Sequence, residues 1–380
     1  MAPLVLLCAS LGLVPPALAQ DVPGGLLAPG NAAVAGFSGV IRPIRAPGDG
    51  GDPLAKTRIN PSGPTLRIVD LRAIGAKPAA QFVDEPKPFT FSAAQIGQVF
   101  AVALDNAVPP NIYAAATSSY GLPIVATGAD GKLNHVEKGQ PAAAFMPAVW
   151  GPKAQGGGPG SIWRIDGVTG AVSLFADVTF NGAANPGPAL GGLAYEPDGD
   201  TLLAADRWTG LIHRFRMDGT EAALYDHGVD GRAAQGLSAA PVDPAPLDVA
   251  SPAFDSANPA TYGYAAPERR VFGLGVRAGR LYYAVAAGLE IWSVALNPDG
   301  GFGKDARREI VVPPGSTATE ISKIAFDDQG RMFLAERAAP TGAFYFEALT
   351  AEGTGRVLRY AIVGAADDGT PIWQPVPDEY

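Results

Sequence analysis

A two-segment unit recurs four times along this chain, and it constrains the fold more than any other feature of the sequence. Each unit has a short apolar segment, a turn with Asp, Asn or Gly, and a second apolar segment that contains Ala near its end. The units occupy residues 99–115, 190–206, 271–285 and 321–336. Such turns between short apolar segments are typical of β-hairpins. The sequence therefore predicts an all-β chain.

Further segments extend each predicted hairpin. An alternating third segment follows each unit, at residues 160–166, 210–215, 289–294 and 355–360. An outer fourth segment is visible at residues 171–175 and 221–225. Four strands per unit at an irregular period are the sequence form of β-propeller blades. We predict a β-propeller of four-stranded blades, with four clear blades and partial units that bring the total to five or six. A β-sandwich, the alternative, would not show this four-strand recurrence.

The residue types of the first segments agree with this architecture. First strands of blades converge on the propeller axis, so small side chains are expected there. They occur at Gly191, Gly192, Ala194, Gly273, Gly275 and Ala325. The 48 Gly and 36 Pro residues also argue against long helices, because these are the poorest helix formers. The net charge of −9, without a run of Lys or Arg, argues against nucleic acid as a partner.

The N-terminus resembles an export signal. An apolar run within residues 2–14 is followed by Ala17-Leu18-Ala19, a cleavage pattern. We therefore expect a signal peptide at 1–19, a secreted or periplasmic location, and no membrane span after its removal. No Lys or Arg precedes the run. The single cysteine, Cys8, lies in the signal, so disulfides, thiol catalysis and thiolate metal sites are excluded from the mature chain.

The rest of the chain divides into a linker and one domain. Residues 20–64 are rich in Gly and Pro and predict an extended linker with one strand at 34–41. The propeller domain is expected at 65–380, either complete in itself or as part of a longer secreted chain. The excess of Arg over Lys indicates a bacterial source.

Long insertions separate the predicted units. They cover residues 119–159, 229–268 and 339–354, and two of them carry paired aromatics: Tyr262 and Tyr264, and Phe344 and Tyr345. Aromatic residues on polar, Pro-rich loops often mark contact sites. The alternative is that these loops fold back as lids over the propeller.

The segment 191–219 resembles one blade of the NHL-repeat and SMP-30 (gluconolactonase)-like β-propellers, and residues 321–336 are similar. The resemblance covers about residues 97–363. It implies the fold and, for the lactonase-type members, one divalent metal held on the axis by Glu, Asn and Asp. Gly191 stands where the Asn is expected, Ser322 where the Asp is expected, and no Glu occurs at 95–98. The enzyme is therefore not favoured.

Charged residues at strand ends are the remaining candidates for a site. Glu320 directly precedes a first strand, at the mouth of the predicted axis. Asp206–Arg207 and Glu336–Arg337 end second strands in matching places. These neighbours predict two carboxylate–guanidinium pairs on one face, for ligand contacts or as ion pairs between blades.

These observations favour a binding or scaffold module without covalent chemistry and without a cofactor. Its ligand would be a protein, a small molecule or a glycan at one propeller face. The alternative is a metal-dependent hydrolase, with one Ca²⁺ or other divalent cation on Glu320 and Asp206. A quinone- or sugar-dependent dehydrogenase would need a cationic cluster with a histidine in the central pocket. The three histidines, His135, His213 and His227, are poorly placed for that role.

Overall fold

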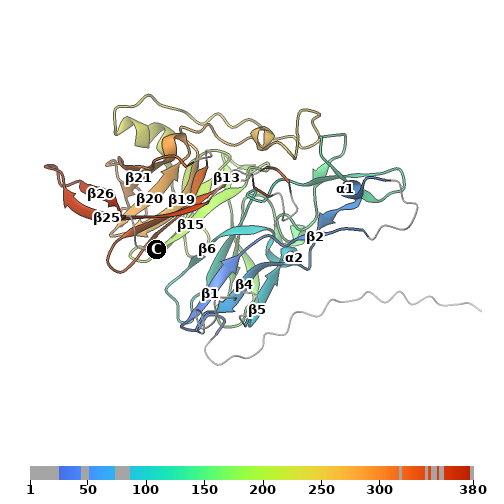
Figure 1. Ribbon diagram of the computed structural model, residues 1–380, viewed down its shortest axis with the longest axis horizontal. Coiled ribbons are helices and arrows are strands. Elements are labelled where there is room, and N and C mark those ends of the chain that lie inside the picture. The colour runs from blue at the N-terminus through green and yellow to red at the C-terminus, as the bar shows by residue number, and fades with distance from the viewer. Residues whose placement is uncertain are drawn as a thin grey trace, which may run out of the picture.

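The computed structural model describes residues 25–43, 51–72, 86–315, 319–338, 341–343, 349–350 and 355–376. Strands and turns dominate these ranges (Figure 1). The α-helices α1 (Pro53–Lys56) and α2 (Ala93–Ile96) each span a single turn. None of the described helices has the length and hydropathy needed to cross a membrane.

Four four-stranded sheets follow one another along the chain. The first contains β6 (Val99–Leu104), β7 (Ile112–Ala116), β11 (Ser161–Ile165) and β12 (Val172–Asp177). The second contains β15 (Leu190–Glu196), β16 (Thr201–Asp206), β17 (Leu211–Arg216) and β18 (Glu221–Asp226). The third contains β19 (Val271–Arg277), β20 (Arg280–Val285), β21 (Glu290–Ala295) and β22 (Arg307–Val311). The fourth contains β23 (Glu320–Phe326), β24 (Met332–Arg337), β25 (Arg356–Ala365) and β26 (Pro371–Pro375).

Each of these sheets is an antiparallel meander, and the first strands of consecutive sheets pack against one another. The approach is close: a Cβ atom added to Gly192 of β15 would lie 2.6 Å from the carbonyl oxygen of Phe272 in β19. A Cβ atom on Gly273 would lie 2.9 Å from the carbonyl oxygen of Ile321 in β23. This is the arrangement of β-propeller blades, and it confirms the predicted fold class and the reason for small residues in the first strands.

A three-stranded sheet lies beside the first blade. It consists of β1 (Asn31–Ala35), β4 (Pro64–Asp70) and β5 (Phe89–Ser92), and β1 packs against β6. β1 falls within the predicted linker. The strand expected at 34–41 is instead divided between β1 and β2 (Val40–Ile41), which pairs with β3 (Arg58–Ile59). The Leu26 and Leu27 side chains just before β1 are buried.

The antiparallel order places the two longest connections of the blades, 117–160 and 227–270, on one face. In a four-stranded meander, the link from second to third strand and the link to the next blade leave from the same edge. We call this side the insertion face; it includes the connections 117–160, 207–210, 227–270, 286–289 and 312–319. The links between first and second and between third and fourth strands form the opposite turn face; most are short, and 296–306 is a longer loop. Two of the three predicted insertions, 119–159 and 339–354, therefore lie within blades, between the second and third strands.

The insertions build a small core of their own. The 117–160 connection contains a three-stranded sheet of β8 (Ile124–Thr127), β9 (Leu133–Val136) and β10 (Ala144–Phe145). β13 (Thr179–Phe180) and β14 (Ala183–Ala184) form a hairpin between the first two blades. Apolar side chains from separate connections pack together here, among them Ile59, Leu122, Met146, Trp150 and Tyr262. The insertion face is therefore a second packed layer above the blades.

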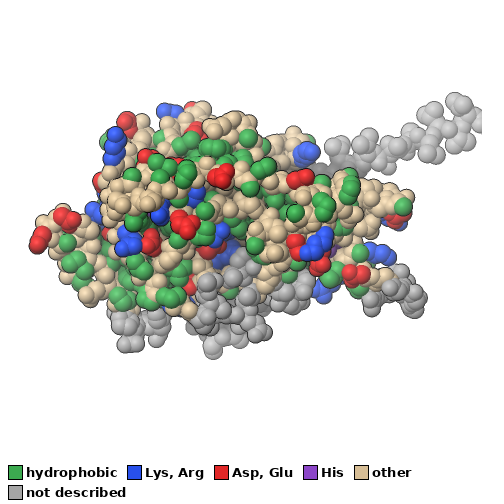
Figure 2. All heavy atoms as spheres, turned by 90° about the horizontal axis from the view of Figure 1, so that it is seen from above, with side chains coloured by type: hydrophobic (Ala, Val, Ile, Leu, Met, Phe, Trp, Pro, Cys, Tyr) green, Lys and Arg blue, Asp and Glu red, His purple; other side chains and the backbone are tan. Residues whose placement is uncertain are grey.

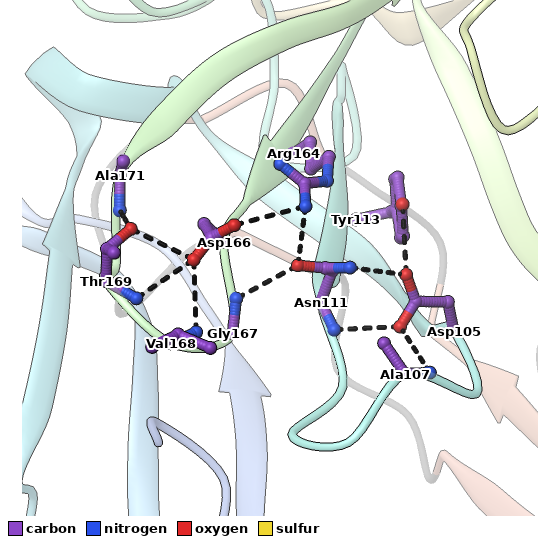
Figure 3. A network of polar contacts seen from close by, with 10 residues as sticks. All are labelled: Asp105, Ala107, Asn111, Tyr113, Arg164, Asp166, Gly167, Val168, Thr169 and Ala171. Atoms are coloured by element: carbon purple, nitrogen blue, oxygen red, sulfur yellow. Dashed lines mark hydrogen bonds and ion pairs between the residues drawn. The ribbon is translucent and has the colours of Figure 1, made fainter.

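Charges on the turn face are paired with local partners. Figure 3 shows the turns of the first blade, where Asn111 Oδ1 accepts hydrogen bonds from Arg164 Nη2 and from the backbone N–H of Gly167. Arg164 also lies 3.2 Å from the Asp166 carboxylate, and Asp105 accepts from the Asn111 side chain. These contacts close the turns, and each charged group of this network has a partner.

Candidate functional site

A hollow opens on the insertion face where the first strands begin. Its volume is about 510 Å³, and Pro259, Tyr264 and Pro267 of the 227–270 connection form part of its wall. Charged side chains from three blades line the rest. Figure 2 looks onto the molecule from the side of this connection and shows acidic and basic side chains interspersed, without an extended area of one sign.

Glu320 is the central carboxylate of the hollow. It is the first residue of β23, and both of its oxygens accept hydrogen bonds from Arg207 Nη2, at 2.8 and 2.6 Å. Arg270 Nε lies 3.1 Å from Glu320 Oε1. Burial alone raises the pKa of the Glu320 carboxyl, but Arg207, Arg270 and Arg337 together hold this pKa below its usual value. Glu320 is therefore an ionised acceptor that joins blades two and four.

Guanidinium groups outnumber carboxylates in this cluster. Arg207, Arg270 and Arg337 all line the hollow, and Glu320 is the carboxylate that they share. Burial lowers the pKa of Arg270 and of Arg337, and repulsion from the Arg207 guanidinium lowers both further. The cluster thus carries an excess of two positive charges.

Aromatic rings hold two of the arginines in place. The Arg207 guanidinium carbon lies 4.2 Å from the ring centre of Tyr264 and 4.4 Å from that of Phe272. The Arg337 guanidinium carbon lies 5.4 Å from Phe272 and 5.7 Å from Phe100. Cation–π contacts of this kind fix the plane of a guanidinium group. Phe100 and Phe272 also pack together, with ring centres 5.4 Å apart, so an aromatic pair lies under the charged cluster.

Several N–H groups of the cluster have no hydrogen-bond partner among the residues that the structure describes. They are Arg207 Nε, Arg207 Nη1 and Arg337 Nη2, and all three atoms are buried. The Arg207 side chain is only 1% exposed. Buried polar atoms in proteins are nearly always satisfied, so these unsatisfied donors require an explanation such as a bound ion or water.

Four of the predicted site residues meet at the hollow. They are Glu320, Arg207, Arg337 and Tyr264. The expected pairing of chain neighbours is wrong, because consecutive residues of a strand point to opposite faces. Arg207 pairs with Glu320 of the fourth blade, whereas Glu336 pairs with Arg356 and accepts a hydrogen bond from Thr319.

Asp206 does not reach the hollow. Its buried carboxylate accepts hydrogen bonds from Asn185 Nδ2, at 2.8 Å, and from the backbone and side chain of Thr209. Burial raises the pKa of this carboxyl. Asp206 therefore fixes the 207–210 turn that orients Arg207.

The two tyrosines of the predicted pair in the 227–270 connection lie in different surroundings. Tyr262 is fully buried in the core of the insertions and donates a hydrogen bond to the Ser256 carbonyl. Tyr264 is half-buried, contacts Ser118 Oγ through its hydroxyl and faces Arg207. The loop therefore packs over the propeller through Tyr262 and presents Tyr264 to the hollow. Phe344 and Tyr345 lie outside the described residues.

Sequence reasoning missed Arg270, Phe100 and Phe272. Arg270 directly precedes β19, and Glu320 stands at the equivalent start of β23. Aligning the residues that begin the first strands would have placed Arg270 beside Glu320. Phe100 and Phe272 carry no such signal, because each occupies the second position of an ordinary apolar strand.

The described residues do not form the metal site expected for a hydrolase. Among them, no three His, Cys, Asp or Glu side chains are grouped as metal ligands. Three guanidinium groups surround Glu320 and oppose a cation there, and Asp206 is engaged elsewhere.

The histidines also lie away from the hollow. His213 Nδ1 lies 2.8 Å from Glu221 Oε2, and His227 Nδ1 lies 3.1 Å from the Tyr283 hydroxyl. His135 Nδ1 lies 3.2 Å from the carbonyl oxygen of Leu54. The cationic cluster that a propeller dehydrogenase would need is present, but none of these histidines lines it.

Comparisons with known proteins found likenesses among solved structures. A chain of the nidogen–laminin complex is 12% identical over 71% of this chain and 66% of that chain, with a TM-score of 0.35. A gluconolactonase from Xanthomonas campestris is 14% identical over 75% and 78%, with a TM-score of 0.33. The computationally designed Ika8 protein is 9% identical over 84% and 54%, with a TM-score of 0.31. The chain thus spans just under two thirds of the first of these proteins and about half of the last.

No family model and no curated protein matches the chain. Its class is defined by its own sheets: it is a β-propeller with an arginine-lined hollow on one face.

Proposed function

We propose that this chain is an exported binding module that holds a small ligand, or a small group of a larger one, non-covalently in the hollow of the insertion face. The observation that carries this proposal is Arg207, which lines a hollow of ligand size and whose buried guanidinium has two N–H positions without partners among the described residues. Ligand sites are typically concave, largely apolar, and furnished with a few fixed polar groups. Export is inferred from the signal-like residues 1–19.

The side chains of the hollow support binding rather than catalysis. A general base works best when its pKa lies near the working pH, but three arginines hold the Glu320 pKa below its usual value. Tyr264, Pro259 and the arginines offer ring faces and hydrogen-bond donors, which recognise a ligand without reacting with it.

The proposal is tested by binding and recovery of small probes. The protein without residues 1–19 is titrated by calorimetry with glucose, acetate, sulfate, inorganic phosphate and glucuronate, and each bound probe is recovered and identified by mass spectrometry. At least one probe is expected to bind saturably and to return unchanged.

Tyr264→Ala is expected to weaken that binding about tenfold, because it removes one ring from Arg207. The matched control is Tyr195→Ala, which truncates a half-buried tyrosine whose hydroxyl contacts Asp200 on the turn face. Equal losses in both variants, or conversion of the probe into a product, would contradict the proposal.

A further inference from the structure

We infer that the hollow is an anion site whose ligand carries an oxyanion group, a carboxylate, sulfate or phosphate, held by Arg207 and Arg337. This inference rests on the proposed function of the hollow and names the chemical class of its ligand.

The hollow carries an excess of positive charge. Three guanidinium groups share one carboxylate, in a place where Arg207 is 1% exposed and Glu320 14% exposed. Buried charge without compensation is costly. The chain as a whole carries −9, so this local positive excess is not part of a generally basic surface. An anion in the hollow would neutralise it.

Arginines that line the hollow have unpartnered donors within the described part of the chain. Arg207 uses Nη2 for both oxygens of Glu320, which leaves Nε and Nη1 without partners. Arg337 contributes Nη2, which is also buried and unpartnered. Planar guanidinium groups bind oxyanions through several N–H groups at once.

Aromatic rings restrict the movement of the two arginines. The rings of Tyr264 and Phe272 flank Arg207, and the rings of Phe272 and Phe100 lie near Arg337. The donors are therefore held in place before a ligand arrives, which lowers the entropic cost of binding. Glu320 contributes by fixing one edge of Arg207, but its charge also opposes an incoming anion.

Other charged groups of the molecule give the contrast. On the turn face, Arg164 is matched by Asp166 and Asn111, and Arg331 by Asp327. The buried Arg269 is matched by Asp226 and two backbone carbonyls. None of these three arginines shares its carboxylate with another arginine in the described ion pairs, in contrast to the arginines of the hollow.

The test measures the affinity of the protein without residues 1–19 for sulfate, inorganic phosphate and acetate at fixed ionic strength in chloride, with glucose as the neutral probe. Arg337→Gln is expected to weaken oxyanion binding at least about tenfold, because it removes a charged donor. Arg216→Gln, at an exposed arginine of β17, changes the net charge equally and should leave the affinity unchanged.

A second variant changes affinity in the opposite direction. Glu320→Gln keeps the shape and an acceptor for Arg207 but removes the negative charge. It is expected to strengthen sulfate binding about fivefold or more, a gain that a merely unfolded or loosened variant would not give.

The anion inference is overturned if the oxyanions bind no more tightly than chloride, or if Arg337→Gln and Arg216→Gln have equal effects. It is also overturned if Glu320→Gln weakens sulfate binding. If glucose binds in a Tyr264-dependent way and the oxyanions do not, the proposed function stands and the anion inference fails. If an oxyanion binds through Arg337 but is chemically converted, the anion site stands and the non-covalent function fails. Absence of binding by every probe would overturn both.

Discussion

Arg207 and Arg214 are both buried arginines of the second blade, 1% exposed, yet their surroundings differ. Arg214 pairs with Glu196 at 3.0 Å, donates to Thr201, and reaches two carbonyl oxygens of the third blade. Arg207 leaves two N–H positions without a partner. Desolvating an unsatisfied donor costs about 1–3 kcal/mol. Arg214 therefore has the contacts of a structural residue, whereas the contacts of Arg207 are those expected for the proposed anion site.

The buried His227 is expected to make the stability of the protein depend on pH. Burial, with Arg232 and Arg269 nearby, lowers its pKa to about 3, against 6.5 for an ordinary histidine. His227 in the unfolded chain therefore binds a proton below pH 6.5, whereas His227 in the folded chain binds one only near pH 3. The contribution of neutral His227 to the free energy of unfolding is fully present above pH 6.5 and is lost as the pH falls below it. Between pH 7 and pH 5 this histidine should lower the free energy of unfolding by about 2 kcal/mol.

Urea unfolding of the wild-type protein and of His227→Gln at pH 5, 6 and 7 checks this. The variant cannot take up the proton at this position, so the difference in stability between pH 7 and pH 5 should shrink by about 2 kcal/mol. An unchanged pH dependence in the variant would show that His227 is not responsible.

The close packing of the first strands limits the size of the side chains that these strands can carry. Gly192 lies so near to β19 that a Cβ atom would approach the Phe272 carbonyl oxygen to 2.6 Å and the Leu274 nitrogen to 2.9 Å. Gly191 is similarly limited by the Phe272 ring. Both neighbours belong to the strand on which Arg207 and Arg337 rest, so the spacing of these strands also positions the hollow.

Gly192→Ala should therefore destabilise the protein by about 1–3 kcal/mol, as overpacking of a close contact does. The control is Gly36→Ala, where the added Cβ atom meets nothing within 4 Å and the backbone conformation is ordinary. Its stability should change by no more than about 0.5 kcal/mol. Thermal unfolding of both variants measures the difference, and equal effects would mean that β15 and β19 are not in such close contact.

Most strands of the blades are predictable from the sequence. The first three strands of each blade were predictable because alternation and turn residues are local signals, as at 201–206 and 211–215. The outer strand β22 carried no clear signal, and β26 (Pro371–Pro375) was not predicted, since it contains two prolines and four of its five side chains are exposed or half-exposed. The pairing of Arg207 with Glu320 was not predictable from spacing, because 113 residues separate them and only the closing of the blades brings them together.

At the scale of the whole molecule, the N-terminal segment is part of the packed structure. β1 pairs along its full length with β4, and the backbone N–H of Leu26 donates to the carbonyl of Gly167 on the turn face of the first blade. Leu26 is 1% exposed and Leu27 8% exposed. The structure thus ties residues 25–35 to two neighbouring sheets.

Deleting residues 1–36 should consequently lower the free energy of unfolding by at least about 3 kcal/mol, since burial of each leucine contributes about 1.5–3 kcal/mol. Deleting residues 1–19, the predicted signal, should leave it unchanged. Urea unfolding of the two truncated chains makes the comparison. If both are equally stable, the N-terminal segment behaves as the linker that its composition suggested.

The placement of the links between second and third strands at one edge has a consequence for redesign. Every blade begins and ends at the same edge, so extra residues at 286–289, between β20 and β21, would emerge beside the hollow and leave the hydrogen-bonded ladders unchanged. A peptide grafted there would be displayed next to Arg270 and Glu320 on a rigid base. Such a graft would change the surroundings of the hollow, while Glu320 and Arg337, which line it, stay in the strands β23 and β24.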